Sequence, residues 1–220
     1  MQLSKETLAL IKNFASINGS LMLKEGTVIS TISEGKNVMA QATIAESLPC
    51  DFGIYDLNEF LGALSIFENA DLQFKEKYVL ISDGNKANIK YFGAGEGIVK
   101  PAPSTIKFPT PDVSFTLTAD QIQMIMKTSG ALKAADVSIA GDGTTLQVIV
   151  SDKKNATSNA YQVDIGTTDQ TFKANFKVEN LKMMPGEYLV EISSKKISKF
   201  TNTGTPLTYF IAIESDSTFE

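Results

Sequence analysis

Lysines recur along one face of the first segment that has helical periodicity. Lys5 and Lys12 are seven residues apart in the segment LSKETLALIKNFASIN, residues 3–18. Seven residues make about two helical turns, so both lysines lie on one polar stripe with Ala9 and Ser16. Ammonium groups on flexible side chains attract phosphates without reading a base sequence. The stripe therefore indicates a nucleic-acid contact or an ordinary solvated helix face, and the helix alone favours the second interpretation.

The residue types that are missing exclude most catalytic chemistry. The chain has no His and no Trp, and all 20 of its basic residues are Lys. Nucleophiles paired with His are impossible, and the commonest metal ligand is absent. Cys50 is the only cysteine, so we expect neither a disulfide nor a zinc site and interpret it as a small buried residue. Carboxylate catalysis stays open, although no spaced pair among the 25 Asp and Glu residues stands out.

Length and composition are those of a globular protein. The 220 residues fit one large domain or two of similar size, and the net charge is -5. No apolar run approaches the roughly 18 residues of a membrane span. The N-terminus, MQLSKETLAL, lacks the basic start and the long apolar core of a signal peptide. We therefore expect an intracellular protein.

The lysine-bearing helix has a counterpart in the second half of the chain. Residues 117–125, LTADQIQMI, match residues 3–11, LSKETLALI, in having an apolar residue, a hydroxyl cap, an early acid and apolar residues at equivalent helical positions. Thr118 and Gln121 also have the spacing of a capping box. Both segments are therefore predicted to be amphipathic helices.

A second, weaker similarity follows in the same order. Residues 54–61 resemble residues 175–182, and strand-like segments follow them at 77–82 and 187–193. Chance similarity between two amphipathic helices is the alternative explanation for either match alone. Agreement in order and spacing favours a duplicated domain.

A Gly- and Pro-rich segment separates the two halves. Residues 93–113, GAGEGIVKPAPSTIKFPTPDV, contain three Gly and four Pro, so neither a helix nor a central strand runs through them. The glycines are not a phosphate loop, because prolines follow them where such a loop needs a helix. We predict an N-terminal domain over residues 1–110, ending in the connector 93–112, and a C-terminal domain over residues 111–220.

The remaining sequence is rich in predicted strands. Asp83-Gly84 and Asp142-Gly143 are hairpin-turn signals. These patterns predict an α+β protein of two similar domains, each with antiparallel sheets outside and two helices together on the inner face. Segments with β-branched and aromatic residues, often alternating, are TVISTIS, NVMAQATI, NIKYFG, TLQVIVS, AYQVDIG, TFKANFKV and LTYFIAIES.

Four motifs resemble a known family. They are LSKxTxALxKNFAxIN from Leu3, IYDLNxFLGxLS from Ile54, KMxPGxY from Lys182 and YxxAxExDST from Tyr209. In combination they resemble the DNA polymerase sliding clamp, or processivity factor, of T-even-type tailed phages. The resemblance covers nearly the whole chain, and none of the motifs is a catalytic signature.

The resemblance implies a DNA clamp fold and a ring of three identical subunits around duplex DNA. Such a clamp performs no chemistry and needs no cofactor or metal. It tethers the replicative polymerase, through a C-terminal peptide of that enzyme, and other replication or transcription factors. An ATP-driven loader places the ring on DNA, and the site of action is the cytoplasm of the infected bacterial host.

In a clamp the first helix of each half faces the DNA, and this assigns the lysines. The DNA-binding residues implied are Lys5, Lys12, Lys127, Lys133 and Lys182. This chain departs from the family pattern because it lacks Arg and has Ser129-Gly130 where another basic residue is typical. We therefore expect weak and strongly salt-dependent DNA attraction.

The resemblance also implies a peptide pocket beside the connector. The predicted pocket residues are Ile106, Phe108 and Pro109 of the connector, with Tyr209 and Ile211 of the last long strand as the facing wall. The alternative is that Ile106 and Phe108 only pin the connector to the second domain. Both interpretations are open on the sequence.

A closed ring needs a head-to-tail interface between two different edges of the subunit. Residues 86–92 and 158–165 are the predicted edge strands, and their pairing would protect both edges. The predicted interface residues are Lys86, Ile89, Lys90, Tyr161 and Asp164.

Two other classes of protein compete with the clamp. A non-catalytic β-rich phage structural protein of the tail or baseplate is also often trimeric, but it needs no lysine-bearing helices at matching positions. A carboxylate-based glycosidase is the third class. The absence of His, Arg and Trp weighs against it, because sugar sites commonly use aromatic platforms and basic orienting groups.

Overall fold

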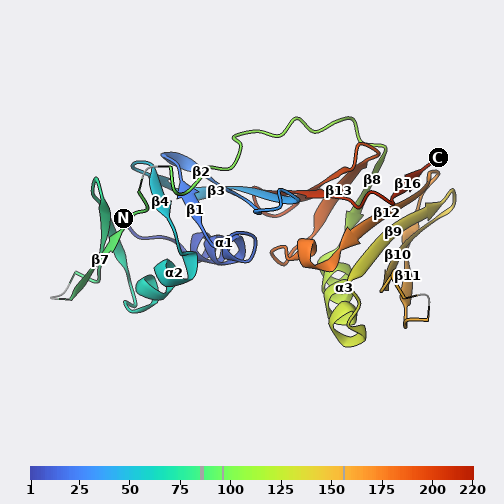
Figure 1. The fold of residues 1–220 in the computed structure, drawn as a ribbon, viewed down its shortest axis with the longest axis horizontal. Coiled ribbons are helices and arrows are strands. Elements are labelled where there is room, and N and C mark those ends of the chain that lie inside the picture. The colour runs from blue at the N-terminus through green and yellow to red at the C-terminus, as the bar shows by residue number, and fades with distance from the viewer. Residues whose placement is uncertain (85–86, 96, 156) are drawn as a thin grey trace. The chain divides into compact units, whose positions relative to one another are not determined.

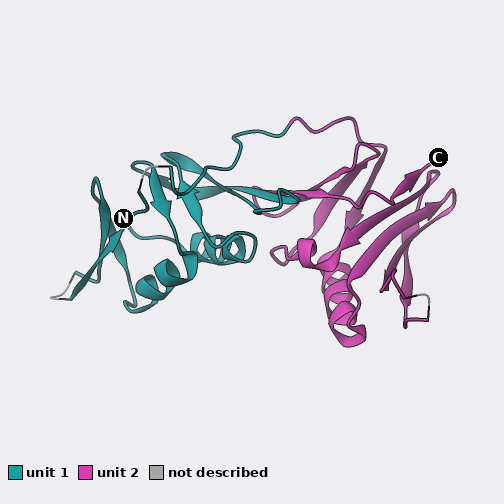
Figure 2. Cartoon of the chain, viewed as in Figure 1, with its two compact units in different colours: residues 1–106 teal, residues 107–220 magenta. Residues whose placement is uncertain are grey.

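The chain divides into two compact units within the Pro-rich connector. The computed structural model describes residues 1–84, 87–95, 97–155 and 157–220. Residues 1–106 form unit 1 and residues 107–220 form unit 2 (Figure 2). No helix among these described residues is long and apolar enough to cross a membrane.

The described residues of unit 1 form two α-helices and seven short to medium strands, many of them labelled in Figure 1. All its strand pairs are antiparallel: β1 with β4, β2 with β3, and β5, β6 and β7 in that order. The elements are α1 (Lys5–Ala15), β1 (Leu21–Leu23), β2 (Gly26–Ile32), β3 (Val38–Leu48), β4 (Phe52–Ile54), α2 (Leu57–Ser65), β5 (Asp71–Phe74), β6 (Tyr78–Ser82) and β7 (Asn88–Phe92).

Helix α1 begins at the predicted cap. The Ser4 hydroxyl accepts a hydrogen bond from the backbone N–H of Thr7 at 3.2 Å, which satisfies one of the free donors of the first turn. Thr7, Ile11 and Phe14 are the buried residues of the helix. Their spacing of three and four residues gives α1 one face toward the core and leaves the lysine stripe outside.

Helix α2 is capped by Asp56, whose carboxylate accepts the N–H groups of Asn58 and Glu59 at 2.9 and 3.0 Å. Its buried face consists of Leu57, Phe60 and Leu64. The Phe60 ring meets Tyr91 of β7 edge to face at 5.1 Å. Tyr91 in turn donates its hydroxyl to the Asp56 carbonyl at 3.0 Å, so α2 is fixed to the three-stranded sheet at its first turn.

Unit 2 repeats the order of a helix, four strands, a second helical element and further strands, and a strand, β8, precedes its first helix. Its elements are β8 (Val113–Leu117), α3 (Ala119–Leu132), β9 (Asp136–Asp142), β10 (Thr145–Ser151), β11 (Tyr161–Thr167), β12 (Thr171–Lys177), η1 (Val178–Leu181), β13 (Tyr188–Ser193), β14 (Ile197–Asn202), β15 (Leu207–Ala212) and β16 (Thr218–Phe219).

The strands of unit 2 form two groups. One sheet has the order β11-β10-β9-β12-β16, and β15, β14, β13 and β8 pair in that order. Alternating residues of both groups fill the core, among them Val137, Phe176, Val190 and Phe200. The C-terminal segment joins the first sheet as a last short strand, so the sheet ends at β11 on one side and at β16 on the other.

Helix α3 has the predicted capping box. Thr118 accepts from the Gln121 N–H at 3.3 Å, and the Gln121 side chain accepts from the Thr118 N–H at 2.9 Å. Lys133 ends the helix in the left-handed conformation, at φ 52°. Ile122 and Ile125 are buried and point toward Val137, Ile139, Leu181 and Phe200 around a small void.

The second helix of unit 2 is shorter than the repeat suggested. Residues 175–182 resemble the start of α2, yet strand β12 continues to Lys177 and only a four-residue 3-10 turn, η1, follows. Pro185 disfavours helical conformation just before it, and the chain must reach β13 at Tyr188. The described part of unit 2 therefore has one full helix and one helical turn, whereas the described part of unit 1 has two helices.

Candidate nucleic-acid and partner interfaces

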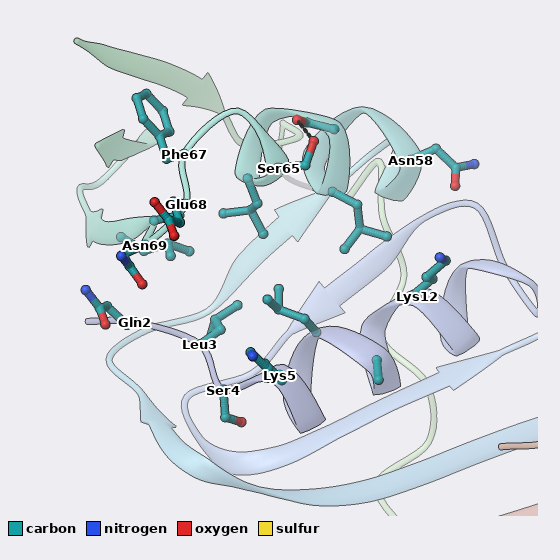
Figure 3. Close-up of a pocket in the computed structure, with 17 residues that line it drawn as sticks. Gln2, Leu3, Ser4, Lys5, Lys12, Asn58, Ser65, Phe67, Glu68 and Asn69 are labelled. Atoms are coloured by element: carbon teal, nitrogen blue, oxygen red, sulfur yellow. Dashed lines mark hydrogen bonds between the residues drawn. The ribbon is translucent and has the colours of Figure 1, made fainter. Parts of the chain in front are cut away.

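Lys5 and Lys12 both lie exposed on α1, on the side away from the buried residues Thr7, Ile11 and Phe14. Both line one rim of a groove between α1 and α2 (Figure 3). The predicted stripe is therefore a real surface of unit 1, with two ammonium groups along the first two turns of the helix.

Glu46 of β3 fixes the start of α1 and was not anticipated from the sequence. Its carboxylate accepts hydrogen bonds from the Ser4 N–H and from the Thr7 hydroxyl, the latter at 2.6 Å. Burial raises the pKa of Glu46, but the hydrogen bonds from Thr7 and Ser4 outweigh it and the pKa is lowered. A carboxylate at the positive end of α1 also interacts favourably with the helix dipole. Glu46 thus sets the direction in which α1 presents its lysines.

The groove between the two helices has a volume of about 730 Å³. We call it the α1–α2 groove. Lys5 and Lys12 are its basic residues, and Glu68 is its acidic residue. The lining residues are Gln2, Leu3, Ser4, Lys5, Leu8, Ala9, Lys12, Asn58, Leu61, Gly62, Leu64, Ser65, Phe67, Glu68, Asn69, Ala70 and Leu72.

The other three predicted DNA-binding lysines belong to unit 2, and all are exposed. Lys127 lies on α3, two turns after its N-terminus, and Lys133 is the residue that ends α3. Lys182 follows η1 directly. Each unit therefore carries exposed lysines on its helical elements.

The connector residue Phe108, which belongs to unit 2, packs on strands β14 and β15. The ring centroid of Phe108 lies 6.2 Å from that of Phe210, and the Lys199 ammonium lies 5.8 Å from the Phe108 ring centroid. Lys199 also donates to a Glu191 carboxylate oxygen at 2.8 Å. Glu191, Lys199 and Phe210 are cross-strand neighbours on β13, β14 and β15. Phe108 thus packs on one face of strands β13, β14 and β15. We call Phe108 together with Glu191, Lys199 and Phe210 the Phe108 row.

Tyr209 and Ile211, the predicted facing wall, lie on the opposite face of β15. Both side chains are fully buried in unit 2. The Tyr209 hydroxyl accepts from the Met184 N–H at 3.0 Å, and burial raises the pKa of Tyr209. Successive residues of a strand point to opposite faces, so the residue of β15 that meets Phe108 is Phe210. Buried side chains cannot line an open pocket, and this part of the predicted pocket needs correction.

The remaining connector residues of the predicted pocket, Ile106 and Pro109, are half-buried. Ile106 is the last residue of unit 1, whereas Pro109 belongs to unit 2. Just beyond them, the Ser193 hydroxyl donates to the Thr110 carbonyl at 3.3 Å, and the Ser194 N–H donates to Asp112 at 2.6 Å. The start of unit 2 is therefore held against the end of β13.

The predicted interface segments form edge strands. β7 ends the three-stranded sheet of unit 1, with Ile89 half-buried and Lys90 exposed. β11 ends the five-stranded sheet of unit 2, with Tyr161 half-buried and Asp164 exposed. Lys86 lies outside the described residues.

Each of these two edges has apolar surface beside it. Phe92 of β7 is 66% exposed, and its ring lies 5.7 Å from that of Tyr78. Next to β11 is an apolar groove of about 220 Å³, the β11 groove, where Met124 of α3 is 45% exposed. Its lining residues are Asp120, Gln121, Met124, Ile125, Val148, Tyr161, Val163 and Ile165.

Each half of the chain matches a known protein family. The family described as DNA polymerase processivity factor matches residues 4–92. The family described as gp45 sliding clamp, C terminal, matches residues 114–215. A curated sliding clamp of Vibrio phage KVP40 is 32% identical over 98% of this chain and 100% of its own. The chain belongs to the sliding clamp family of T4-like phages.

Other relatives of this clamp agree with the assignment. The sliding clamp of Enterobacteria phage T4 is 32% identical over 100% of both chains. The fold extends further: PCNA from A. fulgidus, solved with the C-terminal region of FEN-1 bound, has a TM-score of 0.72 at 10% identity, over 99% of this chain and 98% of that chain. The predicted fold class and the predicted role as a DNA polymerase processivity factor are confirmed, and a tail or baseplate protein is not favoured.

Besides Glu46, the sequence did not predict the α1–α2 groove or the β11 groove of the clamp. The sequence carried little signal for the second, because a single exposed apolar side chain such as Met124 is common on protein surfaces. No cluster of three metal-ligating side chains occurs among the residues described in this clamp.

Proposed function

We propose that three copies of this clamp close into a ring around duplex DNA and tether the replicative polymerase and other replication or transcription factors. The ring acts in the cytoplasm of the infected host, an ATP-driven loader places it on DNA, and it performs no chemistry itself. The observation that carries the proposal is that each unit ends in an edge strand with apolar surface beside it. Two different edges allow a head-to-tail contact, which is the kind that closes a ring.

In this ring β7 of one copy pairs with β11 of the next. The pairing satisfies two rows of backbone groups that otherwise invite aggregation. Exposed apolar side chains of β7, such as Phe92, cover the β11 groove around Met124. Lys90 and Asp164 are both exposed on their strands and have opposite charge, which favours this register over pairing of like edges.

Light scattering over a range of protein concentrations tests the assembly. The expected species has about 71 kDa, three times the subunit mass of 23.8 kDa. Met124→Lys places a charge in the apolar groove and should shift the protein to the monomer mass. Gln123→Lys adds the same charge to an exposed neighbour outside the groove and should leave the trimer intact. A wild-type protein that stays monomeric at every concentration overturns the encircling mechanism.

DNA contact in the ring comes from Lys5, Lys12, Lys127, Lys133 and Lys182, whose ammonium groups approach phosphates loosely. Loose contacts retain DNA while allowing the ring to slide, whereas bidentate base contacts would arrest it. Each phosphate contact contributes about 0.9 to the slope of log affinity against log salt. Removing two lysines from each of three subunits therefore lowers that slope by at most about 5.

Retention of loaded clamp on circular DNA at increasing NaCl measures this effect. Lys5→Ala with Lys12→Ala should shorten retention and reduce its salt dependence. Lys75→Ala with Lys77→Ala removes the same charge from exposed residues at the β5–β6 turn and should leave retention unchanged. Equal retention by the two double variants would remove α1 from the DNA contact.

Partner docking uses the Phe108 row. Phe108 and Phe210 offer aromatic surface beside the Lys199–Glu191 pair, which suits a C-terminal peptide with apolar anchors and a terminal carboxylate. Phe108→Ala should weaken binding of the polymerase C-terminal peptide at least tenfold without changing the oligomer mass. Lys107→Ala, at the exposed neighbouring residue, is the control. Unchanged peptide affinity would leave Phe108 only the role of pinning the connector.

A further inference from the structure

The α1–α2 groove is an open surface depression along two packed helices. Its lining includes a small residue from each helix, Ala9 of α1 and Gly62 of α2. A Cβ atom added at Gly62 meets nothing within 4 Å. Glycine inside a helix is less favourable than alanine. Close packing therefore does not require a glycine at this position, and the space beside Gly62 is open to a ligand.

The floor of the groove is apolar, and duplex DNA does not explain it. Leu3, Leu8, Leu61, Leu64, Phe67 and Leu72 contribute to the lining. A duplex presents phosphates and sugars along its outside, which can engage the rim lysines but cannot cover an apolar floor. The groove volume, about 730 Å³, lies in the range of sites that enclose a ligand's apolar groups.

Charges at the rim select the ligand. Lys5 and Lys12 stand on the α1 side, and Glu68 lies at the end near Asn69 and Gln2 (Figure 3). A complementary ligand has apolar anchors for the floor, carboxylates for the two lysines and a basic group for Glu68. An amphipathic helix with anchors at i, i+3, i+4 and i+7 and acids beside them meets these requirements.

We propose that the α1–α2 groove is a docking site for an acidic amphipathic helix of a partner protein. The helix lays its apolar stripe over Leu8 and Leu61 and pairs its carboxylates with Lys5 and Lys12. The same lysines contact DNA in the proposed ring, so a docked helix and encircled DNA exclude each other. The mutual exclusion of helix and DNA rests on the proposed function, whereas docking of the helix does not.

The test measures fluorescence anisotropy of synthetic helical peptides titrated with the full chain. The acidic probe has leucines at i, i+3, i+4 and i+7 with glutamates beside them and one lysine at the end that meets Glu68. One control peptide replaces the glutamates by lysines, and another replaces the leucines by serines. Only the acidic amphipathic probe should bind, with affinity that falls as salt is raised.

Gly62→Gln is the decisive variant, because it fills the groove without changing charge and with no clash at its Cβ. Gly62→Gln should lower the affinity of the clamp for the acidic probe at least tenfold. Gly130→Gln is the matched control, since Gly130 is also an exposed helical glycine with nothing within 4 Å of an added Cβ, but on α3. It should leave the probe affinity unchanged, and circular dichroism of both variants should match the wild type.

The outcomes separate docking from the proposed function. Equal affinity of wild type and Gly62→Gln for the acidic probe overturns the site, as does equal binding of the lysine peptide. Gly62-dependent binding of a single-stranded oligonucleotide in place of the peptide also overturns it, in favour of a nucleotide site. Probe binding that depends on Gly62 while the clamp is never retained on DNA keeps the docking site and refutes only the competition.

Discussion

The hydrogen bonds of Glu46 hold the lysine-bearing helix to the sheet, and removing them gives a prediction for the stability of unit 1. Glu46→Ala deletes the acceptor for the Ser4 N–H and for the Thr7 hydroxyl, which lies 2.6 Å away. Thr7 is only 1% exposed, so water does not readily replace the lost partner. The Ser4 hydroxyl, 3.0 Å from the Thr7 hydroxyl, keeps one contact in place.

The magnitude follows from the number and type of these bonds. A hydrogen bond to a charged group contributes about 1.5–3 kcal/mol, and a charge near a helix N-terminus about 0.3–1 kcal/mol. Glu46 is half-buried, so its two bonds count at the lower end. We expect Glu46→Ala to lower the free energy of unfolding by about 2–3 kcal/mol, and Glu46→Gln, which keeps an acceptor oxygen, by about 1 kcal/mol.

The pH dependence gives the sign of the effect. The pKa of Glu46 is lowered in the folded clamp because its hydrogen bonds outweigh burial. A depressed carboxyl pKa contributes stability that is complete above the unfolded-state value of about 4.3 and is lost as pH falls through the folded-state value. The difference between wild type and Glu46→Ala should therefore be constant near neutral pH and shrink below about pH 4.

Urea unfolding followed by circular dichroism between pH 3 and 8 measures both effects. Glu34→Ala, an exposed carboxylate in the β2–β3 turn, is the control and should change stability by less than about 0.5 kcal/mol. A loss for Glu46→Ala as small as that of the control would refute the reasoning. A large loss that does not change with pH would show that the carboxylate charge is not the cause.

Three further predictions concern unit 2. Thr118→Ala removes half of the α3 capping box and should lower the free energy of unfolding in urea by about 1 kcal/mol. Thr116→Ala, on the exposed side of β8, is the control and should lower it much less. Asp136 is 1% exposed and pairs with Lys177, whose pKa it raises. Asp136→Ala should therefore lower the free energy of unfolding by about 3 kcal/mol at pH 7. A decrease below about 1 kcal/mol would mean that water solvates the Lys177 ammonium in place of Asp136. Gly141→Ala brings a Cβ to 2.5 Å from the carbonyl oxygen of Gln170. Thermal melting should therefore show a decrease of about 1–3 kcal/mol in the free energy of unfolding. An unchanged melting temperature would show that β9 and β12 can move apart to accommodate the methyl group.

The sequence by itself determined the local structure of this clamp. Ser4 and Thr118 cap their helices as predicted, because a hydroxyl followed by apolar helical spacing specifies a helix start within a few residues. Asp142-Gly143 forms the predicted hairpin turn, with Gly143 at φ 85°, a conformation that glycine adopts without strain. Alternation identified the strands, since a half-buried strand has period two. The four motifs identified the family because they depend on residue identity and order alone.

The tertiary structure decided how these elements meet. Alternation along β15 fixes that Tyr209 and Phe210 face opposite ways, but only the packed sheet shows that Tyr209 enters the core and Phe210 meets Phe108. Glu46 reaches Thr7 across 39 residues, and no local pattern encodes such a contact. The repeat predicted a helix after residue 175, yet β12 continues to Lys177, because its pairing with β9 outweighs a weak local preference. Grooves likewise arise from the distance between packed elements, which depends on side chains far apart in the chain.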